Sequence, residues 1–389
     1  MKKKCLIIIP GIPYPPVNGY KLKIYNLIKI LFKHYDLHLI IISREVPNAI
    51  ERKFLEDHSY KYAYFRIELI SALLRVFISI FSSIPFQVAY FTLPTVRRYI
   101  KRNANSDEIV FLNLIRSGEY IDLFRKKNVV FDMVDLLSKS YVKSYHSTKS
   151  LMYKVIYKIE AKRLKIYELK VVKESLLTLC VNNDDANYLS AFGKSIWLPN
   201  GVNDSLFIYN KLSSKYKHSI AFFGAMHYQP NIDAVIWFDH YVMNHIDSNI
   251  IFYIIGAKPS KQILNILKHR DNVIVTGFME DPYLILNSCF AVIAPMQNGG
   301  GIQNKILETM SLGKINILTS HGADPIKGAV NDVDFIVRNT PLEMAIKIND
   351  IFKHPSKYKA MGGNASRFIK ENYTWERYEE NLLIALNRF

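Results

Sequence analysis

The sequence has little cysteine. Its three cysteines, Cys5, Cys180 and Cys289, lie far apart, and each sits inside an apolar run. This spacing excludes a disulfide framework and the closely paired cysteines of a zinc site. We therefore expect reduced thiols buried in the core and a cytosolic protein.

The sequence also lacks an uninterrupted membrane-spanning run. The apolar run near the N-terminus extends only from Cys5 to Ile9, which is shorter than the roughly 7–15 residues of a signal-peptide core, and we predict a first β-strand there. The uncharged stretch 76–96 approaches the roughly 20 residues that span a bilayer, but it contains Pro85 and Pro94. We expect an apolar helix and loop that is buried or lies on a membrane surface, with a spanning helix as the minor alternative.

Acidic residues are in short supply. The chain has 51 Lys and Arg against 34 Asp and Glu, a formal charge of +17, and nearly all of the excess falls in residues 1–200. This charge suits a membrane face, a phosphate-bearing substrate or nucleic acid, and a generally basic surface of solvated lysines is an equal alternative. Nucleic acid is disfavoured because the basic residues form no motif with interleaved aromatics.

A chain of 389 residues is long enough for two domains. Short β-branched runs alternate with helical patterns throughout, which predicts two α/β domains of the doubly wound, Rossmann-like type, facing across a cleft. We expect an N-terminal acceptor-side domain at residues 1–200 and a second domain at 201–370. A terminal helix at 371–389 is expected to pack back toward the first domain.

Two loops that follow predicted strands are glycine-containing helix entrances. PGIPYPPVNGY, residues 10–20, ends with Gly19 before a helix, and FFGAMHYQPNIDAVIWF, residues 222–238, passes through Gly224 to a helix that begins near Asn231. Glycine allows close backbone approach, and free N–H groups at a helix start favour anions. A rigid loop without a ligand is the alternative in both places.

The third loop, QNGGGIQNKILETM at residues 297–310, has three consecutive glycines before a helix expected from about Ile302. The unpaired N–H groups of such a helix suit a diphosphate. Lys305 supplies a positive charge for phosphate, and Glu308 accepts hydrogen bonds from a ribose diol. The alternative is a solvated helix face beside a flexible turn.

These motifs together, with VIVTGFMEDPYLIL at 273–286 and TWERYEENLL at 374–383, resemble the GT-B glycosyltransferases of the family-four type. The likeness covers nearly the whole chain and is greatest to bacterial sugar transferases that assemble cell-surface polysaccharides, including lipopolysaccharide and capsule. It implies a hexosyltransferase-type enzyme that uses a nucleotide-diphosphate sugar and retains the anomeric configuration. It also implies that no metal or other cofactor is needed.

The resemblance assigns donor-binding residues mainly to the second domain. The loop 276–282, with Gly277 and Phe278, holds the base. The glycine-rich helix start holds the diphosphate, Glu308 holds the ribose, and Gly19 approaches the phosphates from the first domain. The full donor set is Gly19, Gly224, Asn231, Gly277, Phe278, Gly300, Gly301, Ile302, Asn304, Lys305 and Glu308.

Two positions depart from the family pattern. The family commonly has two glutamates with seven residues between them, and here Gly300 stands at the first position while Glu308 fills the second. Many members carry Arg and Lys after the Gly224-type turn, where this chain has Asn231 and Asp233. Lys305 is therefore the substitute candidate for the diphosphate.

On the acceptor side, Asp132 and Asp135 follow the predicted strand NVVFD, and Arg116 follows EIVFLNL. Either aspartate is a candidate to orient or deprotonate an acceptor hydroxyl, and Arg116 is a candidate phosphate ligand. Capping of the following helix is the commoner use of aspartate at such a place.

The sequence thus predicts transfer of a sugar to a glycan acceptor, which we expect to be lipid-linked, by a cytoplasmic enzyme held on the anionic inner face of the cell membrane. The alternatives are a nucleotide-sugar epimerase or hydrolase of the same fold and a catalytically inactive membrane-associated scaffold.

Overall fold

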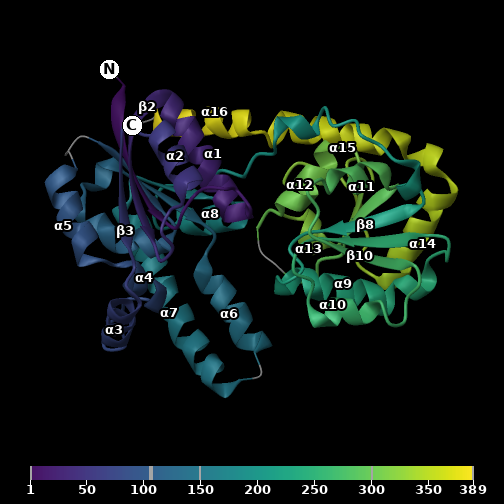
Figure 1. The fold of residues 1–389 in the computed structure, drawn as a ribbon, viewed down its shortest axis with the longest axis horizontal. Coiled ribbons are helices and arrows are strands. Elements are labelled where there is room, and N and C mark those ends of the chain that lie inside the picture. Colours follow the sequence, from purple (N-terminus) through teal and green to yellow (C-terminus); the bar gives the residue numbers. More distant parts are fainter. Residues whose placement is uncertain (1, 105–107, 149, 299–300, 388–389) are drawn as a thin grey trace. The chain divides into compact units, whose positions relative to one another are not determined.

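The structure is a computed structural model that describes residues 2–104, 108–148, 150–298 and 301–387. The chain divides into two compact units, Met1–Leu198 and Pro199–Phe389, close to the division expected after residue 200. Each unit contains a parallel sheet with helices on both faces (Figure 1). The predicted class of two doubly wound α/β domains is therefore confirmed.

The first unit is built on a seven-stranded parallel sheet of order β3-β2-β1-β4-β5-β6-β7. Its strand β1 is buried from Cys5 onward, which explains why its sequence is apolar without alternation. The strands are β1 (Lys3–Pro10), β2 (Tyr35–Ser43), β3 (Lys61–Arg66), β4 (Ile109–Asn113), β5 (Val129–Val134), β6 (Leu177–Cys180) and β7 (Ser195–Trp197). The helices are α1 (Gly19–His34), α2 (Ala49–Asp57), α3 (Leu69–Ser79), α4 (Phe86–Phe91), α5 (Pro94–Asn103), α6 (Leu137–Ser147), α7 (Leu151–Glu174) and α8 (Asn183–Ser190).

The second unit has a six-stranded parallel sheet of order β10-β9-β8-β11-β12-β13. Its strands are β8 (Ser219–Phe223), β9 (Ile251–Ile255), β10 (Val273–Gly277), β11 (Ala291–Ala294), β12 (Ile315–Leu318) and β13 (Ile336–Val337). Its helices are α9 (Gln229–Tyr241), α10 (Lys261–Ile266), α11 (Tyr283–Ser288), α12 (Asn304–Ser311), α13 (Ser320–Ala323), α14 (Pro341–Lys353), α15 (Lys359–Asn372) and α16 (Trp375–Leu386). Helices α9 and α10 lie on one face of the sheet, and α11, α12 and α15 lie on the other (Figure 1).

Strand order reverses at one place in each sheet, between β1 and β4 in the first and between β8 and β11 in the second. Crossover connections leave in opposite directions there, so a crevice opens beyond the carboxyl ends of the two strands. The three glycine-containing loops and the segment with Arg116 follow these four strands, whereas the loop 276–282 follows β10 and the two aspartates lie at the end of β5. The fold therefore places Gly19 and Arg116 at one reversal, and Gly224 and Gly301 at the other.

Helix α7 holds the ends of three other helices in the first unit. Glu160 accepts a hydrogen bond from the first backbone N–H of α4 at 3.0 Å, and Glu168 accepts one from the N–H of Ser138 in α6 at 3.0 Å. Arg163 donates to carbonyl oxygens at the end of α3, at 3.1 and 2.8 Å. These contacts satisfy helix-terminal backbone groups and match the helix dipoles.

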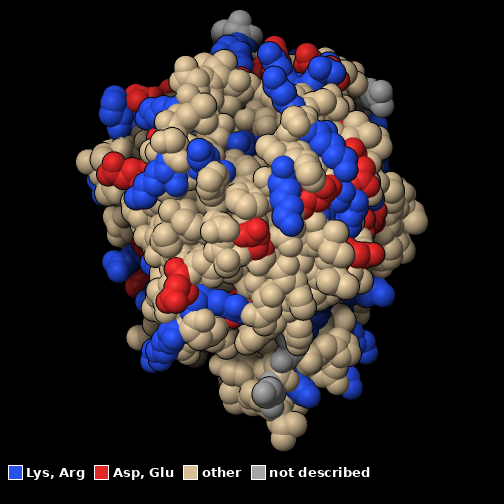
Figure 2. Space-filling model, turned by 90° about the vertical axis from the view of Figure 1, so that its right-hand side faces the viewer, with Lys and Arg blue, Asp and Glu red and all other residues tan. Residues whose placement is uncertain are grey.

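The uncharged stretch 76–96 is not one continuous helix, because α3 ends at Ser79 and α4 begins at Phe86. Within the described ranges, no helix is long and apolar enough to cross a membrane. All three cysteines are buried and free, as expected. Lys and Arg are interspersed with Asp and Glu on the face drawn in Figure 2.

Candidate functional site

Three neighbouring strands of the second unit end in glycines with positive φ: Gly224 (+153°), Gly256 (+154°) and Gly277 (+71°). The Gly256 N–H donates to the Gly277 carbonyl at 3.1 Å, and a Cβ on Gly256 would lie 1.7 Å from the Gly224 carbonyl oxygen. The strand ends therefore meet through backbone alone. The sequence analysis missed Gly256, whose signal is a glycine directly after the apolar run NIIFYII.

Helix α12 begins at Asn304, so the expectation of a helix from about Ile302 was wrong by two residues. Gln303 adopts extended φ and ψ angles at the N-cap, and its side chain makes no capping hydrogen bond. The Ile306 N–H donates to the Gln303 carbonyl at 2.9 Å, and the Gln303 side chain leaves the N–H groups of Asn304 and Lys305 uncapped, where a helix start favours an anion. Gly301, just before them, has a φ of +77° that favours glycine, whereas Gly300 lies outside the described residues.

Lys305, in the first turn of α12, reaches the loop that follows β8. Its Nζ donates to Asn231 Oδ1 at 2.6 Å and lies 4.2 Å from the centre of the Phe222 ring. Burial lowers the pKa of the ammonium group to about 7, because the charged form is poorly solvated there. The Lys305 ammonium group therefore lies next to Asn231, one of the positions where the family resemblance led us to look for a substitute cation.

Glu308 lies one turn further along α12 and accepts a hydrogen bond from the Tyr283 hydroxyl at 3.2 Å. Burial raises the pKa of the Glu308 carboxyl to about 7, and the bond from Tyr283 opposes that rise. Tyr283 had not been singled out, since nothing in DPYLIL shows that α11 faces α12. The pair leaves a second carboxylate oxygen available for other donors.

The other donor candidates lie on α9, at the end of β10 and near the start of α12. Asn231 is buried, and its Nδ2 donates to the Ala225 carbonyl at 2.9 Å, so the amide braces the turn after Gly224. Phe278 is 76% exposed beside Gly277, whose missing side chain would point into open space. The Asn304 side-chain oxygen accepts a hydrogen bond from Asn200 Nδ2 at 3.2 Å. Ile302 is half-buried.

In the first unit, Gly19 is the exposed first residue of α1, and the preceding Asn18 caps that helix by accepting from the Lys21 N–H at 2.9 Å. Asp132 is fully buried. It forms an ion pair with Lys23 and accepts from Asn113 Nδ2 at 2.8 Å, so its carboxylate is already engaged within the fold.

Asp135 and Arg116 present more accessible groups. Asp135 is exposed to solvent, yet surrounding protein and the neighbouring carboxylate of Asp185 raise its pKa to about 6. Arg116 donates from Nε to Gln87 Oε1 at 3.1 Å. Val134, between the two aspartates, has a φ of +67°, which is strained for a β-branched residue and is a feature that clusters at functional sites.

The structure therefore places the candidates in two groups, one in each unit. In the second unit, Lys305 contacts Asn231 beside Gly224 and Gly256, and Glu308 contacts Tyr283 one turn further along α12. Asp132, Asp135 and Arg116 lie at the ends of β5 and β4 in the first. Their assigned roles remain predictions.

Residues 217–354 match the family model described as "Glycosyl transferases group 1". Over 95% of this chain and 96% of the relative, the chain is 24% identical to a Klebsiella pneumoniae protein described as "Uncharacterized 44.6 kDa protein in cps region". It is 22% identical, over 97% of this chain and 96% of the relative, to an uncharacterized glycosyltransferase of Methanocaldococcus jannaschii.

Among solved structures, Anabaena HepE in complex with UDP and glucose superposes with a TM-score of 0.68 and 12% identity, covering all of both chains. WaaG, a glycosyltransferase involved in lipopolysaccharide biosynthesis, gives a TM-score of 0.64 and 10% identity, covering 97% of this chain and 98% of WaaG. Residues 217–354 therefore match the glycosyltransferase group 1 family, and the whole chain has the two-domain fold of the GT-B glycosyltransferases to which it is similar.

Proposed function

We propose that the protein transfers a hexose, with retention, from a nucleoside-diphosphate sugar to a glycan acceptor during cell-surface polysaccharide assembly. The observation that carries the proposal is the start of α12, where uncapped N–H groups and Glu308 share a helix with Lys305, whose ammonium contacts Asn231 beside Gly224. UDP is the first nucleotide to test, because HepE was crystallised with UDP and glucose.

Each part of the donor has a matching group. The diphosphate lies against the first turn of α12 and the Lys305 ammonium, Glu308 accepts from the ribose hydroxyls, and the base lies along Gly277 and Phe278. Negative charge develops on the leaving diphosphate as the bond to the sugar breaks. Fixed N–H groups and one ammonium group stabilise that charge, so we propose that transfer needs no metal ion.

Transfer can be tested with a radiolabelled UDP-hexose panel and a membrane extract as the source of acceptor, with and without EDTA. We expect label in a glycan product from at least one donor, with EDTA causing less than a twofold loss. Release of free sugar or an epimerised donor without acceptor would instead favour the hydrolase or epimerase alternative. A chain that binds no UDP-hexose and transfers nothing would favour the scaffold.

We also propose a lipid-linked acceptor at an anionic membrane surface on the cytoplasmic side. The first unit exposes an apolar surface along α3 and the residues that follow it, with Ile70 78%, Ile78 65% and Phe81 81% exposed. Helix α7, tied to α3 through Arg163, exposes Leu151, Met152 and Val155 near its start. Several exposed apolar side chains along one helix, as on α3, indicate an interaction surface.

The charges around this surface favour an anionic partner. Helix α7 carries many lysines, whereas two of its three acidic residues, Glu160 and Glu168, are buried and bonded to the ends of α4 and α6, and the third, Glu174, is its last residue. The solvent-facing side of α7 is therefore strongly basic. Each basic residue near an anionic bilayer contributes about 1 kcal/mol to binding.

Flotation with liposomes of neutral lipid, alone or with 30% anionic lipid, tests this attachment. We expect co-flotation only with anionic lipid and a several-fold loss in Phe81→Ser. Ile208→Ser is the matched control, because Ile208 is also 81% exposed but lies in the second unit. Equal recovery in the unbound fraction with both lipids would refute membrane attachment and leave the transfer reaction untouched.

A further inference from the structure

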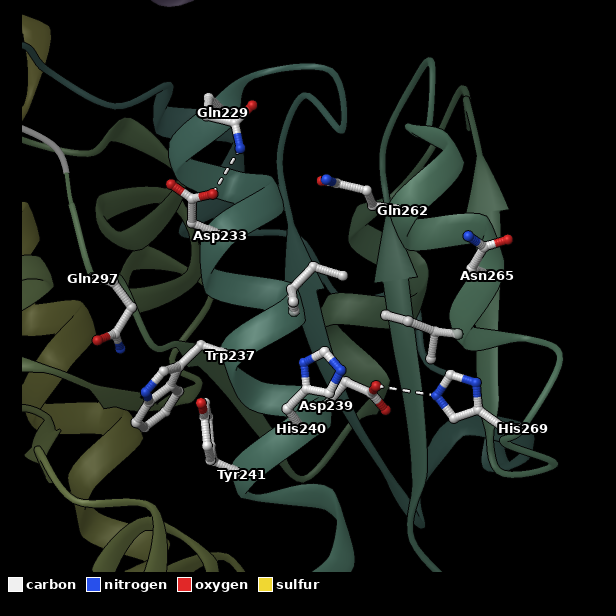
Figure 3. Close-up of a pocket in the computed structure, with 12 residues that line it drawn as sticks. Gln229, Asp233, Trp237, Asp239, His240, Tyr241, Gln262, Asn265, His269 and Gln297 are labelled. Atoms are coloured by element: carbon white, nitrogen blue, oxygen red, sulfur yellow. Dashed lines mark hydrogen bonds and ion pairs between the residues drawn. The ribbon is translucent and has the colours of Figure 1, made fainter. Parts of the chain in front are cut away.

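A groove of about 710 Å³ lies along α9 and α10 of the second unit (Figure 3). Trp237, His240 and Tyr241 line it from α9, Gln262 and Asn265 line it from α10, and Gln297 lines it from the loop after β11. In Figure 3, Gln297 lies beside Trp237, and the two amides of α10 lie across from α9. None of these side chains belongs to the donor set.

The groove combines aromatic faces with unused amide groups. Trp237 and Tyr241 are one helical turn apart, with ring centres 6.3 Å from each other, and Tyr241 is 57% exposed. Over the described part of the chain, the side chains of Gln262 and Asn265 make no hydrogen bond, so their donors and acceptors are available to a ligand.

The charges of the groove do not favour anionic ligands. Among the described residues that line it there is no lysine or arginine, although the chain has a formal charge of +17. The lining also contains Asp239, which is held by Arg270 at 2.8 Å, and Asp233, which accepts from Gln229 at 2.7 Å. Phosphates, nucleic acid and anionic lipid would therefore meet two aspartates and no lysine or arginine in this lining, whereas a neutral ligand rich in hydroxyl groups would find matching amides.

The groove is elongated and begins near the donor site. Gln229 lines it at the start of α9, two residues before Asn231, which contacts Lys305. Tyr241 lines it at the other end of α9, about 18 Å away at the helical rise of about 1.5 Å per residue. This length suits a chain of several sugar rings more than a single monosaccharide.

We propose that this groove binds a segment of neutral oligosaccharide. The apolar faces of sugar rings stack on Trp237 and Tyr241, and their hydroxyl groups exchange hydrogen bonds with Gln262, Asn265 and Gln297. The inference rests on the proposed function, since a glycan-building enzyme meets such a chain as its acceptor or product. The groove holds that chain outside the reacting centre, and the binding needs no donor.

Affinity electrophoresis of the full-length chain tests the proposal, using native gels that contain dextran, mannan or galactan, with a hyaluronate gel as the anionic reference. We expect at least one neutral gel to retard the protein, and Trp237→Ala to weaken that binding about tenfold. Retardation by hyaluronate depends on the overall charge of the protein, so Trp237→Ala and the unaltered protein should be retarded equally in that gel. Tyr153→Ala, which removes a 48% exposed tyrosine from the first unit, is the matched control and should behave as the unaltered protein.

Stabilisation by UDP in a thermal-shift assay verifies that each variant is folded. If Trp237→Ala loses that stabilisation, the more exposed Tyr241 supplies the deciding variant, Tyr241→Ala. No retardation by any neutral gel, or equal retardation of folded groove variants, would overturn the inference. So would a dimer that Trp237→Ala converts to a monomer in light scattering, because the groove would then bind a second copy. Retardation by a neutral gel in a protein that neither binds UDP nor transfers sugar would refute the proposed function but would still support oligosaccharide binding in the groove.

Discussion

The Lys305 ammonium nitrogen donates to the Asn231 side-chain oxygen at 2.6 Å, which joins the start of α12 to the start of α9. Asn231 is in turn fixed by its bond to the carbonyl of Ala225. The cation is therefore held at the strand reversal between β8 and β11, where the GT-B fold opens its crevice. The Lys305 ammonium group has no carboxylate partner in the described part of the chain, so an anionic ligand would provide the negative charge that pairs with it.

The first prediction concerns the stability cost of Glu308. Its raised pKa means that the folded protein binds more protons than the unfolded chain between about pH 4.5 and 7, so stability falls as pH rises through that window. Glu308→Gln should therefore raise the free energy of unfolding of the ligand-free protein at pH 8 by about 1–3 kcal/mol, with little change at pH 4.5. Urea unfolding at pH 4.5 and pH 8 measures these free energies of unfolding. Glu371 is exposed, so the control Glu371→Gln should change the free energy of unfolding at neither pH.

The second prediction is a pH dependence of UDP binding that belongs to Lys305. Its pKa of about 7 means that the free protein loses this charge above neutrality, while Glu308 stays ionised. UDP affinity should therefore fall several-fold between pH 7.5 and 9.5. Lys305→Arg should flatten the profile, because arginine remains charged throughout. The same slope in both proteins would assign the titration to another group.

The third prediction compares two glycines: Gly256, where close packing requires glycine, and Gly363, where only helix propensity is affected. A Cβ at Gly256 would collide with the Gly224 carbonyl oxygen at 1.7 Å, and its φ of +154° also disfavours other residues. Gly256→Ala should cost about 2–4 kcal/mol of stability and weaken nucleotide binding. Gly363 in α15 has no neighbour within 4 Å of such a Cβ, so Gly363→Ala should be neutral or add up to about 1 kcal/mol. Thermal unfolding compares the two, and equal effects would contradict the packing argument.

The fourth prediction distinguishes the two aspartates of the first unit. Asp132 is buried against Lys23, so Asp132→Asn leaves an unpaired buried ammonium and should destabilise the fold by about 3–5 kcal/mol. Asp135 is exposed, and a carboxyl whose pKa is raised in the folded protein does not stabilise it at neutral pH, so Asp135→Asn should not lower the unfolding midpoint while reducing transfer at least tenfold if this carboxylate assists the acceptor. A fully active Asp135→Asn would remove it from the catalytic candidates.

The sequence was informative where local pattern determines structure. Apolar strands followed by glycines located the loops at both strand reversals, and QNGGGIQNKILETM located α12 to within two residues. It could not show contacts between distant segments. Lys23 belongs to an ordinary amphipathic pattern, yet it is buried against Asp132, 109 positions away. Likewise, Tyr283 contacts Glu308 only because α11 packs beside α12, and Gly256 contacts Gly224 only because β9 pairs with β8. The groove on α9 was missed for the same reason, since α10 supplies its facing side.

Isothermal titration of UDP into the 389-residue protein at pH 7 measures donor binding at α12, with Glu308→Gln, Lys305→Ala and Glu371→Gln titrated in parallel. We expect one UDP per chain, affinity reduced at least about tenfold in each of the first two variants, and unchanged affinity in the third. Absence of UDP binding, or equal affinity in all four proteins, would contradict a donor site built on α12.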